Sequence, residues 1–214
     1  MKTFYRRNLP HYQFDKSYYF ITFRLYNSLQ KEVIEYLKNY YLKNKREILK
    51  IKDCDLRSVK LYELQKRYFG IFDRHLDTNR ECINYLSDPR IAGIVVNSIG
   101  HRDKTDYETL AYCIMPNHVH LLIYVQRFLK PLYKIMQSLK RYTGRESNKI
   151  INRTGSFWHE ESYDHIVRNQ RELININSYI MNNPVKAGLV KNACDWKWRY
   201  SKLFTEHGLK IRAT

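Results

Sequence analysis

The chain of 214 residues has little glycine, proline or cysteine, with 7, 5 and 4 of these residues. Its cysteines form no CxxC pair, so neither a zinc knuckle nor a secreted disulfide framework is predicted. No apolar run approaches the roughly 20 residues of a membrane-spanning helix. The basic N-terminus is not followed by the apolar segment and cleavage site of a signal peptide. These absences favour a cytoplasmic protein.

Acidic residues are also scarce. Lys and Arg outnumber Asp and Glu by 38 to 21, which gives a net charge of +17 and favours a polyanionic partner, with nucleic acid first. The 19 tyrosines, several beside basic residues, are typical of surfaces that stack bases and contact phosphates of single strands. Core packing is the alternative for each ring. A membrane surface would need a long basic amphipathic helix, and Glu32, Glu35 and Glu47 interrupt the best one.

The hydrophobic fraction of 43% is enough for one sizeable core, and no internal repeat is present. Aromatic and β-branched residues predict a strand over 18–25, and the later apolar runs predict strands over 110–115 and 118–125. Helical spacing predicts a helix over 29–51 that continues as a charged helical stretch to 77, and another that begins at 78 and breaks at 87–89. Further helices are predicted from Pro131 and over 170–182, the last ended by Pro184. This order indicates an α+β fold, a ferredoxin-like or RRM-like antiparallel sheet with helices packed on one face. We expect a single domain over 1–214, with residues 29–77 as an inserted helical arm.

The pentapeptide NHVHL, whose two histidines lie on the predicted strand 118–125, is the strongest chemical signal. Side chains at i and i+2 of a strand share a face, so His118 and His120 would lie side by side while Val119 packs on the other face. Two neutral imidazoles suit a divalent ion. A His pair that faces solvent or bonds its neighbours is the alternative.

The last predicted helix carries Tyr179 on its polar arc, away from the apolar residues of the same helix. Asn183 lies one turn further on that face, where its amide oxygen could join His118 and His120 as a metal ligand. Capping of the helix end before proline is the alternative for Asn183. Tyr142 is a rival nucleophile because its neighbours are basic, but it falls on the apolar stripe of its helix, which favours core packing.

Several separated motifs together resemble one family. The strings MPNHVHLLI, SFWHEESYDHIVRN and YIMNNPVKAGLV, followed by WKWRYS, resemble the REP-associated tyrosine transposases, within the single-tyrosine HUH, IS200-like transposases. The N-terminal RNLPHY and the strand YFITFRL also fit. The resemblance covers nearly the whole chain.

The resemblance implies cleavage and rejoining of single-stranded or hairpin DNA. His118 and His120 match the HUH pair that holds one divalent ion, Mg or Mn, and Asn183 matches the polar third ligand. Tyr179 matches the nucleophile that forms a 5′-phosphotyrosine link and leaves a free 3′-OH. The resemblance also implies a bacterial, nucleoid-associated protein, and a monomer is preferred over a dimer that exchanges the tyrosine helix.

Two other functions remain open from the residues. One is a non-catalytic single-strand-binding protein on the same fold, and the other is a metal-dependent phosphodiesterase that uses water and does not need Tyr179. The shared FWHEESYDHIVRN segment also places His159, Glu160, His165 and Arg168 near the active site or DNA, with packing as the alternative for each.

Overall fold

The computed structural model describes residues 4–6, 10–78, 83–205 and 208–209. These divide into two compact units, one from residues 1–26 and 83–214 and the other from residues 27–82. Residues 7–9 of the RNLPHY motif and residues 79–81 of a predicted helix lie outside the described part.

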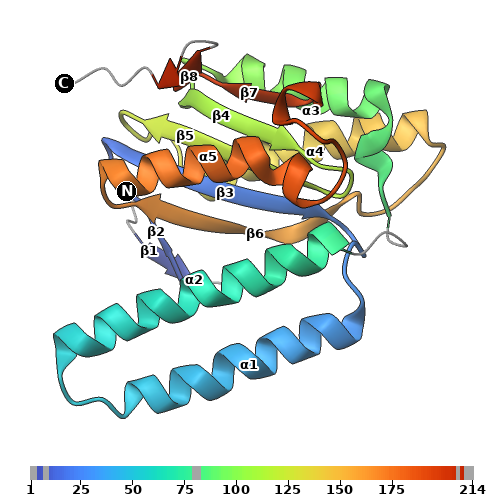
Figure 1. Cartoon of the computed structure of the whole chain (residues 1–214). Helices are drawn as coiled ribbons and strands as arrows, with labels where there is room; N and C mark the ends of the chain where they lie inside the picture. Colours follow the sequence, from blue (N-terminus) through green and yellow to red (C-terminus); the bar gives the residue numbers. More distant parts are fainter. Residues whose placement is uncertain (1–3, 7–9, 79–82, 206–207, 210–214) are drawn as a thin grey trace. The chain divides into compact units, whose positions relative to one another are not determined.

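The larger unit is built on a five-stranded antiparallel sheet (Figure 1). Its strands follow the order β6-β3-β5-β4-β7. Their bounds are Ser17–Leu25 for β3, Glu108–Ile114 for β4, His118–Val125 for β5, Trp158–Val167 for β6 and Arg199–Ser201 for β7. Short strand pairs also form, β1 (Phe4–Arg6) with β2 (Pro10–Tyr12) and β8 (Phe204–Thr205) with β9 (Gly208–Leu209).

Strands β3, β4, β5 and β6 and the two helices packed on them follow one another as a ferredoxin-like β-α-β-β-α-β unit, which confirms the predicted α+β class. The helices are α3 (Pro89–Arg102) and α4 (Leu132–Ile150). Short 3-10 turns, η1 (Tyr85–Ser87) and η2 (Ala193–Asp195), lie outside this unit.

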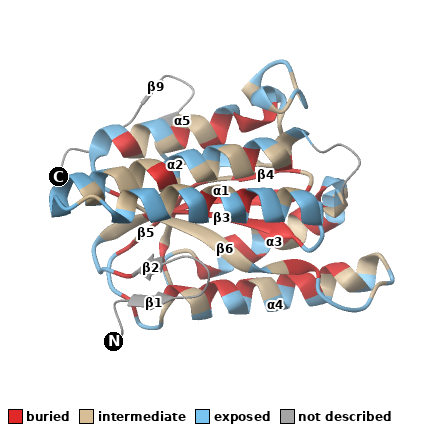
Figure 2. Ribbon diagram, turned by 90° about the horizontal axis from the view of Figure 1, so that it is seen from below, coloured by how far each residue is buried: buried red, intermediate tan, exposed pale blue. Residues whose placement is uncertain are grey.

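The main core lies between the sheet and the α3–α4 layer. Alternate residues of β3 and β5 point into it, among them Ile21, Phe23, Val119 and Leu121, all at most 1% exposed. Val119 therefore faces the packed side, as predicted. Buried residues are red in Figure 2, and most residues of β3 and β5 are among them.

The other face of the sheet carries α5 (Gln170–Lys186), so the prediction that all helices share one face is wrong. Helix α5 lies across β4, β5, β6 and β7 (Figure 1). The residues of β3 and β5 that alternate with the core set, including Thr22 and His120, point to this second face.

Pro184 does not end α5, contrary to the sequence prediction. A proline costs a helix most in its interior, but only the last turn follows Pro184 here. The end is formed instead by Gly188, whose φ of 67° suits glycine, and by bonds from the Ala187 and Leu189 amides to the Asn183 and Pro184 carbonyls. Asn183 is thus a residue of the helix and not its cap.

Strands β6 and β7 were not predicted. Most residues of β6 are half-buried and polar on both faces, so neither apolar alternation nor a continuous apolar run marks it. It is specified by pairing with β3, which places Phe20 opposite His165 and Ile21 opposite Asp164.

The smaller unit is a helical hairpin of α1 (Lys31–Leu49) and α2 (Cys54–Thr78), close to the predicted helical segments. Within it the ring of Tyr41 packs edge-on against Tyr68, with centroids 5.3 Å apart. Among the described residues, no helix is long and apolar enough to cross a membrane.

Candidate metal centre

His118 and His120 lie side by side on β5, as predicted, and both are buried. Their Nε2 atoms are 3.0 Å apart. Two ligands roughly 2.1 Å from one octahedral ion and at right angles to each other would be about this far apart. The pair could therefore hold a metal ion.

A polar side chain occupies the other nitrogen of each imidazole. His118 Nδ1 donates to Asn117 Oδ1 at 2.6 Å, and the Thr22 hydroxyl lies 2.8 Å from His120 Nδ1. Such bonds fix the ring orientation and leave Nε2 with the lone pair that a metal ligand needs. Sequence reasoning did not assign either role, although the cross-strand pairing of Thr22 with His120 follows once the register is known.

Asn183 of α5 closes the site from above the sheet. Its amide nitrogen is 2.5 Å from His120 Nε2, while its Oδ1 is buried without a hydrogen-bond partner. Turning the amide over exchanges the two atoms and directs the oxygen at the histidine pair. An oxygen and two imidazoles are a donor set that fits a divalent ion.

Tyr179 lies one turn before Asn183 on the same helix and reaches the same place. Its ring centroid is 5.5 Å from that of His120 and 6.1 Å from that of Phe20. The Lys186 ammonium lies 5.2 Å from the Tyr179 ring centroid, which puts a positive charge beside the hydroxyl-bearing ring. The four predicted residues thus come together in one chain.

Polar contacts near its start and in its middle help to hold α5 on the sheet. Near its start, buried Glu172 accepts from the Arg168 amide at 2.9 Å and lies 3.2 Å from His165 Nε2 of β6. In its middle, Asn177 Oδ1 accepts from the Ser201 hydroxyl of β7 at 2.9 Å. His165 and Arg168 therefore anchor the tyrosine helix through Glu172.

The structure separates Tyr142 from this site. Tyr142 is 47% exposed, so the prediction that it packs in the core is wrong. Thr143 continues the buried stripe instead, because its hydroxyl accepts from Trp158 Nε1 at 2.8 Å. The Tyr142 ring lies beside the guanidinium of Arg145.

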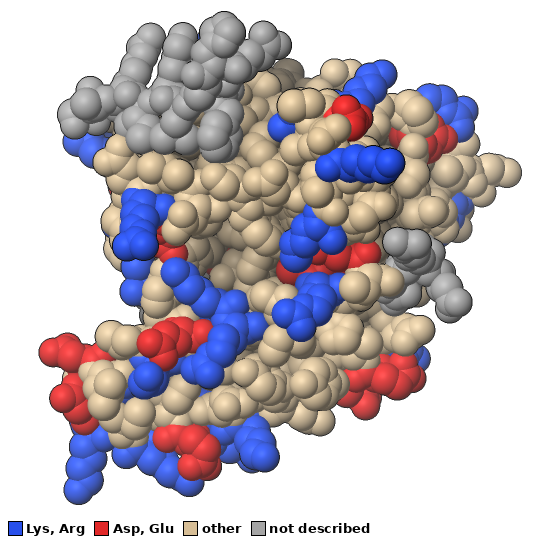
Figure 3. All heavy atoms as spheres, viewed as in Figure 1, with Lys and Arg blue, Asp and Glu red and all other residues tan. Residues whose placement is uncertain are grey.

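Positive charge predominates on the face shown in Figure 3, where Lys and Arg are spread over both units.

His159 has its pKa lowered, first by burial and then by the positive charge of Arg24, so its ring is neutral at neutral pH. The His159 backbone carbonyl oxygen accepts a hydrogen bond from Lys140 of α4 at 3.0 Å.

Part of the chain matches a known protein family. Residues 91–183 match the family model described as "Transposase IS200 like". That range begins in α3, ends at Asn183 and includes both histidines and Tyr179. This part of the chain is therefore similar to the IS200-like transposases.

Two individual proteins are also similar to this chain. A protein of Haemophilus influenzae, named as a REP-associated tyrosine transposase, is 30% identical over 102 residues, which cover 43% of this chain and 57% of that protein. The match thus spans little more than half of the relative's length. A solved REP-associated tyrosine transposase bound to a REP hairpin is 15% identical with a TM-score of 0.50 over 98% of each chain, so it shares the fold. The predicted resemblance is confirmed.

Proposed function

We propose that this chain is a metal-dependent, single-tyrosine DNA transposase that cleaves and rejoins single-stranded DNA at hairpin sequences. The carrying observation is the convergence of His118, His120 and Asn183 with Tyr179, although about sixty residues separate β5 from the tyrosine helix. The solved relative is bound to a REP hairpin, which supports this substrate class.

In this proposal the Tyr179 hydroxyl attacks the scissile phosphorus. The P–O3′ bond breaks, the 3′-oxygen leaves as a hydroxyl, and the 5′-phosphate stays on the tyrosine. Attack by another 3′-hydroxyl reverses these bonds and joins the strands, so the phosphotyrosine conserves the energy of the broken linkage.

His118, His120 and Asn183 would hold a Mg or Mn ion, which supplies Lewis-acid stabilisation of the phosphate charge. A tyrosine hydroxyl is a weak nucleophile with an ordinary pKa near 10, so it needs such help. Lys186 adds a second positive charge next to the tyrosine ring. Thr22 and Asn117 hold the two imidazoles in the orientation that directs both Nε2 atoms into the site.

We further propose that residues 1–214 act as one HUH transposase domain with the hairpin of residues 29–77 as an insertion. One copy contains the tyrosine and the three ligands, which supports a monomer that works in cis.

The test uses hairpin oligonucleotides labelled at the 3′ end, with a randomised single-stranded flank because the target sequence is unknown. With Mn²⁺ present, the label should become attached to the wild-type protein, and EDTA should prevent this. Tyr179→Phe should form no adduct. Tyr142→Phe is the matched control and should react like the wild type.

An adduct that persists in Tyr179→Phe would assign the nucleophile elsewhere. Cleavage by Tyr179→Phe without an adduct would indicate the water-dependent phosphodiesterase. A wild-type protein that binds the oligonucleotides and never reacts would indicate the non-catalytic binding protein.

A further inference from the structure

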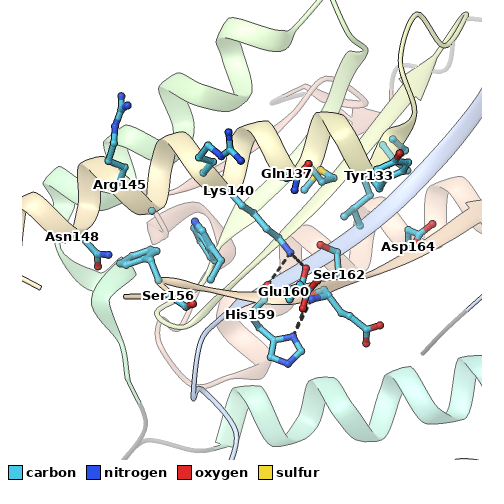
Figure 4. Close-up of a pocket in the computed structure, with 18 of the residues that line it drawn as sticks. Tyr133, Gln137, Lys140, Arg145, Asn148, Ser156, His159, Glu160, Ser162 and Asp164 are labelled. Atoms are coloured by element: carbon cyan, nitrogen blue, oxygen red, sulfur yellow. Dashed lines mark hydrogen bonds between the residues drawn. The ribbon is translucent and has the colours of Figure 1, made fainter. Parts of the chain in front are cut away.

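A groove of about 650 Å³ lies between α4 and the edge strand β6, and we name it the α4–β6 groove (Figure 4). Its volume falls in the range of about 300–1,000 Å³ of small-molecule pockets, which admits a nucleotide but not a duplex. Its floor includes buried Phe157 and Trp158. Gly144 of α4 allows the floor to approach this helix closely, since a Cβ at this position would lie only 3.1 Å from that of Phe157.

The wall formed by α4 is basic. Arg141 and Arg145 line it and are exposed, and Lys140 reaches across it. The Lys140 ammonium donates to the carbonyl oxygens of His159 and Glu160 at 3.0 and 3.1 Å (Figure 4). These three cations are the type of group that contacts backbone phosphates.

The wall formed by β6 is acidic, with Glu160, Glu161 and Asp164. A groove that only bound phosphate would gain nothing from carboxylates, which repel anions. Carboxylates instead accept hydrogen bonds from the amino groups of bases. A cationic wall opposite an acidic wall, over an aromatic floor, thus matches the phosphate, the base edge and the base face of one unpaired nucleotide.

The α4–β6 groove and the candidate metal centre lie on opposite faces of the sheet, and strand β6 contributes residues to both faces. Asp164 pairs with Ile21 on the core-side face of the sheet, whereas its neighbour His165 pairs with Phe20 on the face that carries α5. Phe20 in turn contacts the rings of His120 and Tyr179. A strand of DNA bound in the groove needs to pass only the edge strand β6 to reach the tyrosine.

We propose that the α4–β6 groove binds unpaired nucleotides of the DNA strand that Tyr179 cleaves. This inference rests on the proposed function and adds a second subsite to it. Arg141 and Arg145 contact the phosphates, and the β6 carboxylates select the base. Thymine offers one ring N–H between two carbonyl oxygens, so it should bind more weakly than cytosine, whose amino group suits a carboxylate.

The test measures binding of fluorescent dC8 and dT8 to the full chain in EDTA, where no cleavage occurs. Arg141→Gln combined with Arg145→Gln should weaken dC8 binding about tenfold or more and lower the slope of log K against log salt by about 1.4. The matched control combines Lys134→Gln with Lys149→Gln. These lysines are exposed on the same helix outside the groove, and Lys149 contacts Glu146 as Arg145 does.

A second pair of variants tests the base selection. Glu160→Gln with Glu161→Gln should reduce the preference for dC8 over dT8, and it adds no positive charge to the α4 wall. Equal weakening in the arginine and lysine doubles would overturn the proposal, because it would indicate general attraction to charge. Unchanged binding in the arginine double, or no base preference in the wild type, would also overturn it.

The covalent assay separates this inference from the proposed function. The variant Arg141→Gln with Arg145→Gln could form the adduct normally and also bind dC8 normally. That result would support the proposed transposase function and reject the groove as a binding site. If the arginine variant selectively loses dC8 binding and the wild-type chain never forms an adduct, the groove is supported as a binding site and the proposed covalent chemistry is rejected.

Discussion

Each imidazole of the histidine pair is held at Nδ1 by a polar neighbour, and the two neighbours come from different segments. Thr22 lies on β3, and Asn117 directly precedes β5. Partners of this kind commonly contribute 10- to 100-fold to metal affinity. The strength of the site should therefore depend on residues that touch no ion.

Thr22→Val keeps the side-chain shape and removes the hydroxyl beside His120. We expect the dissociation constant for Mn²⁺, measured by isothermal titration calorimetry, to rise by roughly 10- to 100-fold. The matched control is Thr109→Val on β4, because the Thr109 hydroxyl is buried without a hydrogen-bond partner. Equal affinity in the Thr22 variant and the wild type would remove the supporting role of Thr22.

The sequence predicts that the two histidines share one face of a strand, but it does not reveal the side chains that support them. The two-residue spacing of His118 and His120 on a strand suffices to put both on one face. The support from Thr22 depends on how β3 and β5 pair, and no local pattern specifies that register. The prediction for Tyr142 was wrong because the choice between Tyr142 and Thr143 depends on the hydrogen bond with Trp158 of a distant strand.

Helix α5 is the element that brings the tyrosine to the histidines, and its first turn is tied to β6 through Glu172. That carboxylate is buried and satisfies both the Arg168 amide and His165. A buried group that loses its partner costs about 1–3 kcal/mol. The same loss would free the beginning of the helix to shift on the sheet.

Glu172→Ala should lower the stability of α5 by about 1–3 kcal/mol, seen as faster hydrogen exchange of its first-turn amides. Adduct formation at Tyr179 should slow, while the affinity for short oligonucleotides in EDTA should stay unchanged. Gln170→Ala, at an exposed position of the same turn, is the control. Slower adduct formation with normal hydrogen-exchange protection of α5 would contradict a positioning role.

The helices and strands that could be predicted from the sequence are those with a regular pattern of apolar residues. Strands β3, β4 and β5 follow it as nearly continuous apolar, buried runs, and helices α1 to α4 follow it through their helical spacing. Strand β6 could not be predicted, since its sides face a polar groove and a polar site and carry no apolar alternation. The end of α5 was misplaced because Pro184 falls in a last turn that the following Gly188 completes.

For the molecule as a whole, stability should come from the core between the sheet and the α3–α4 layer, while the other face is left for chemistry. Leu121 is fully buried in that core, directly after His120 in sequence but on the opposite side of the sheet. Alternation alone thus places a core residue and a candidate metal ligand of β5 on opposite faces of the sheet.

Leu121→Ala should lower the free energy of unfolding by about 2–5 kcal/mol through lost burial and the cavity left behind. Leu129→Ala, at a residue that is 78% exposed, should change it by less than about 0.5 kcal/mol. Urea denaturation followed by circular dichroism gives both values. A similar, small effect in both variants would mean that the core is not where stability resides.

The pairing of β6 with β3 has a consequence for insertions and deletions. Phe23 lies opposite Ser162 and Leu25 opposite Trp158, so four steps on β6 match two on β3. The surplus residues swing out as a bulge, and Lys140 bonds two of the carbonyls that the ladder leaves there. Loss of two residues from this segment would keep Trp158 on the core face, whereas loss of one would turn it to the other side. Natural length changes in this strand are therefore expected to come in twos.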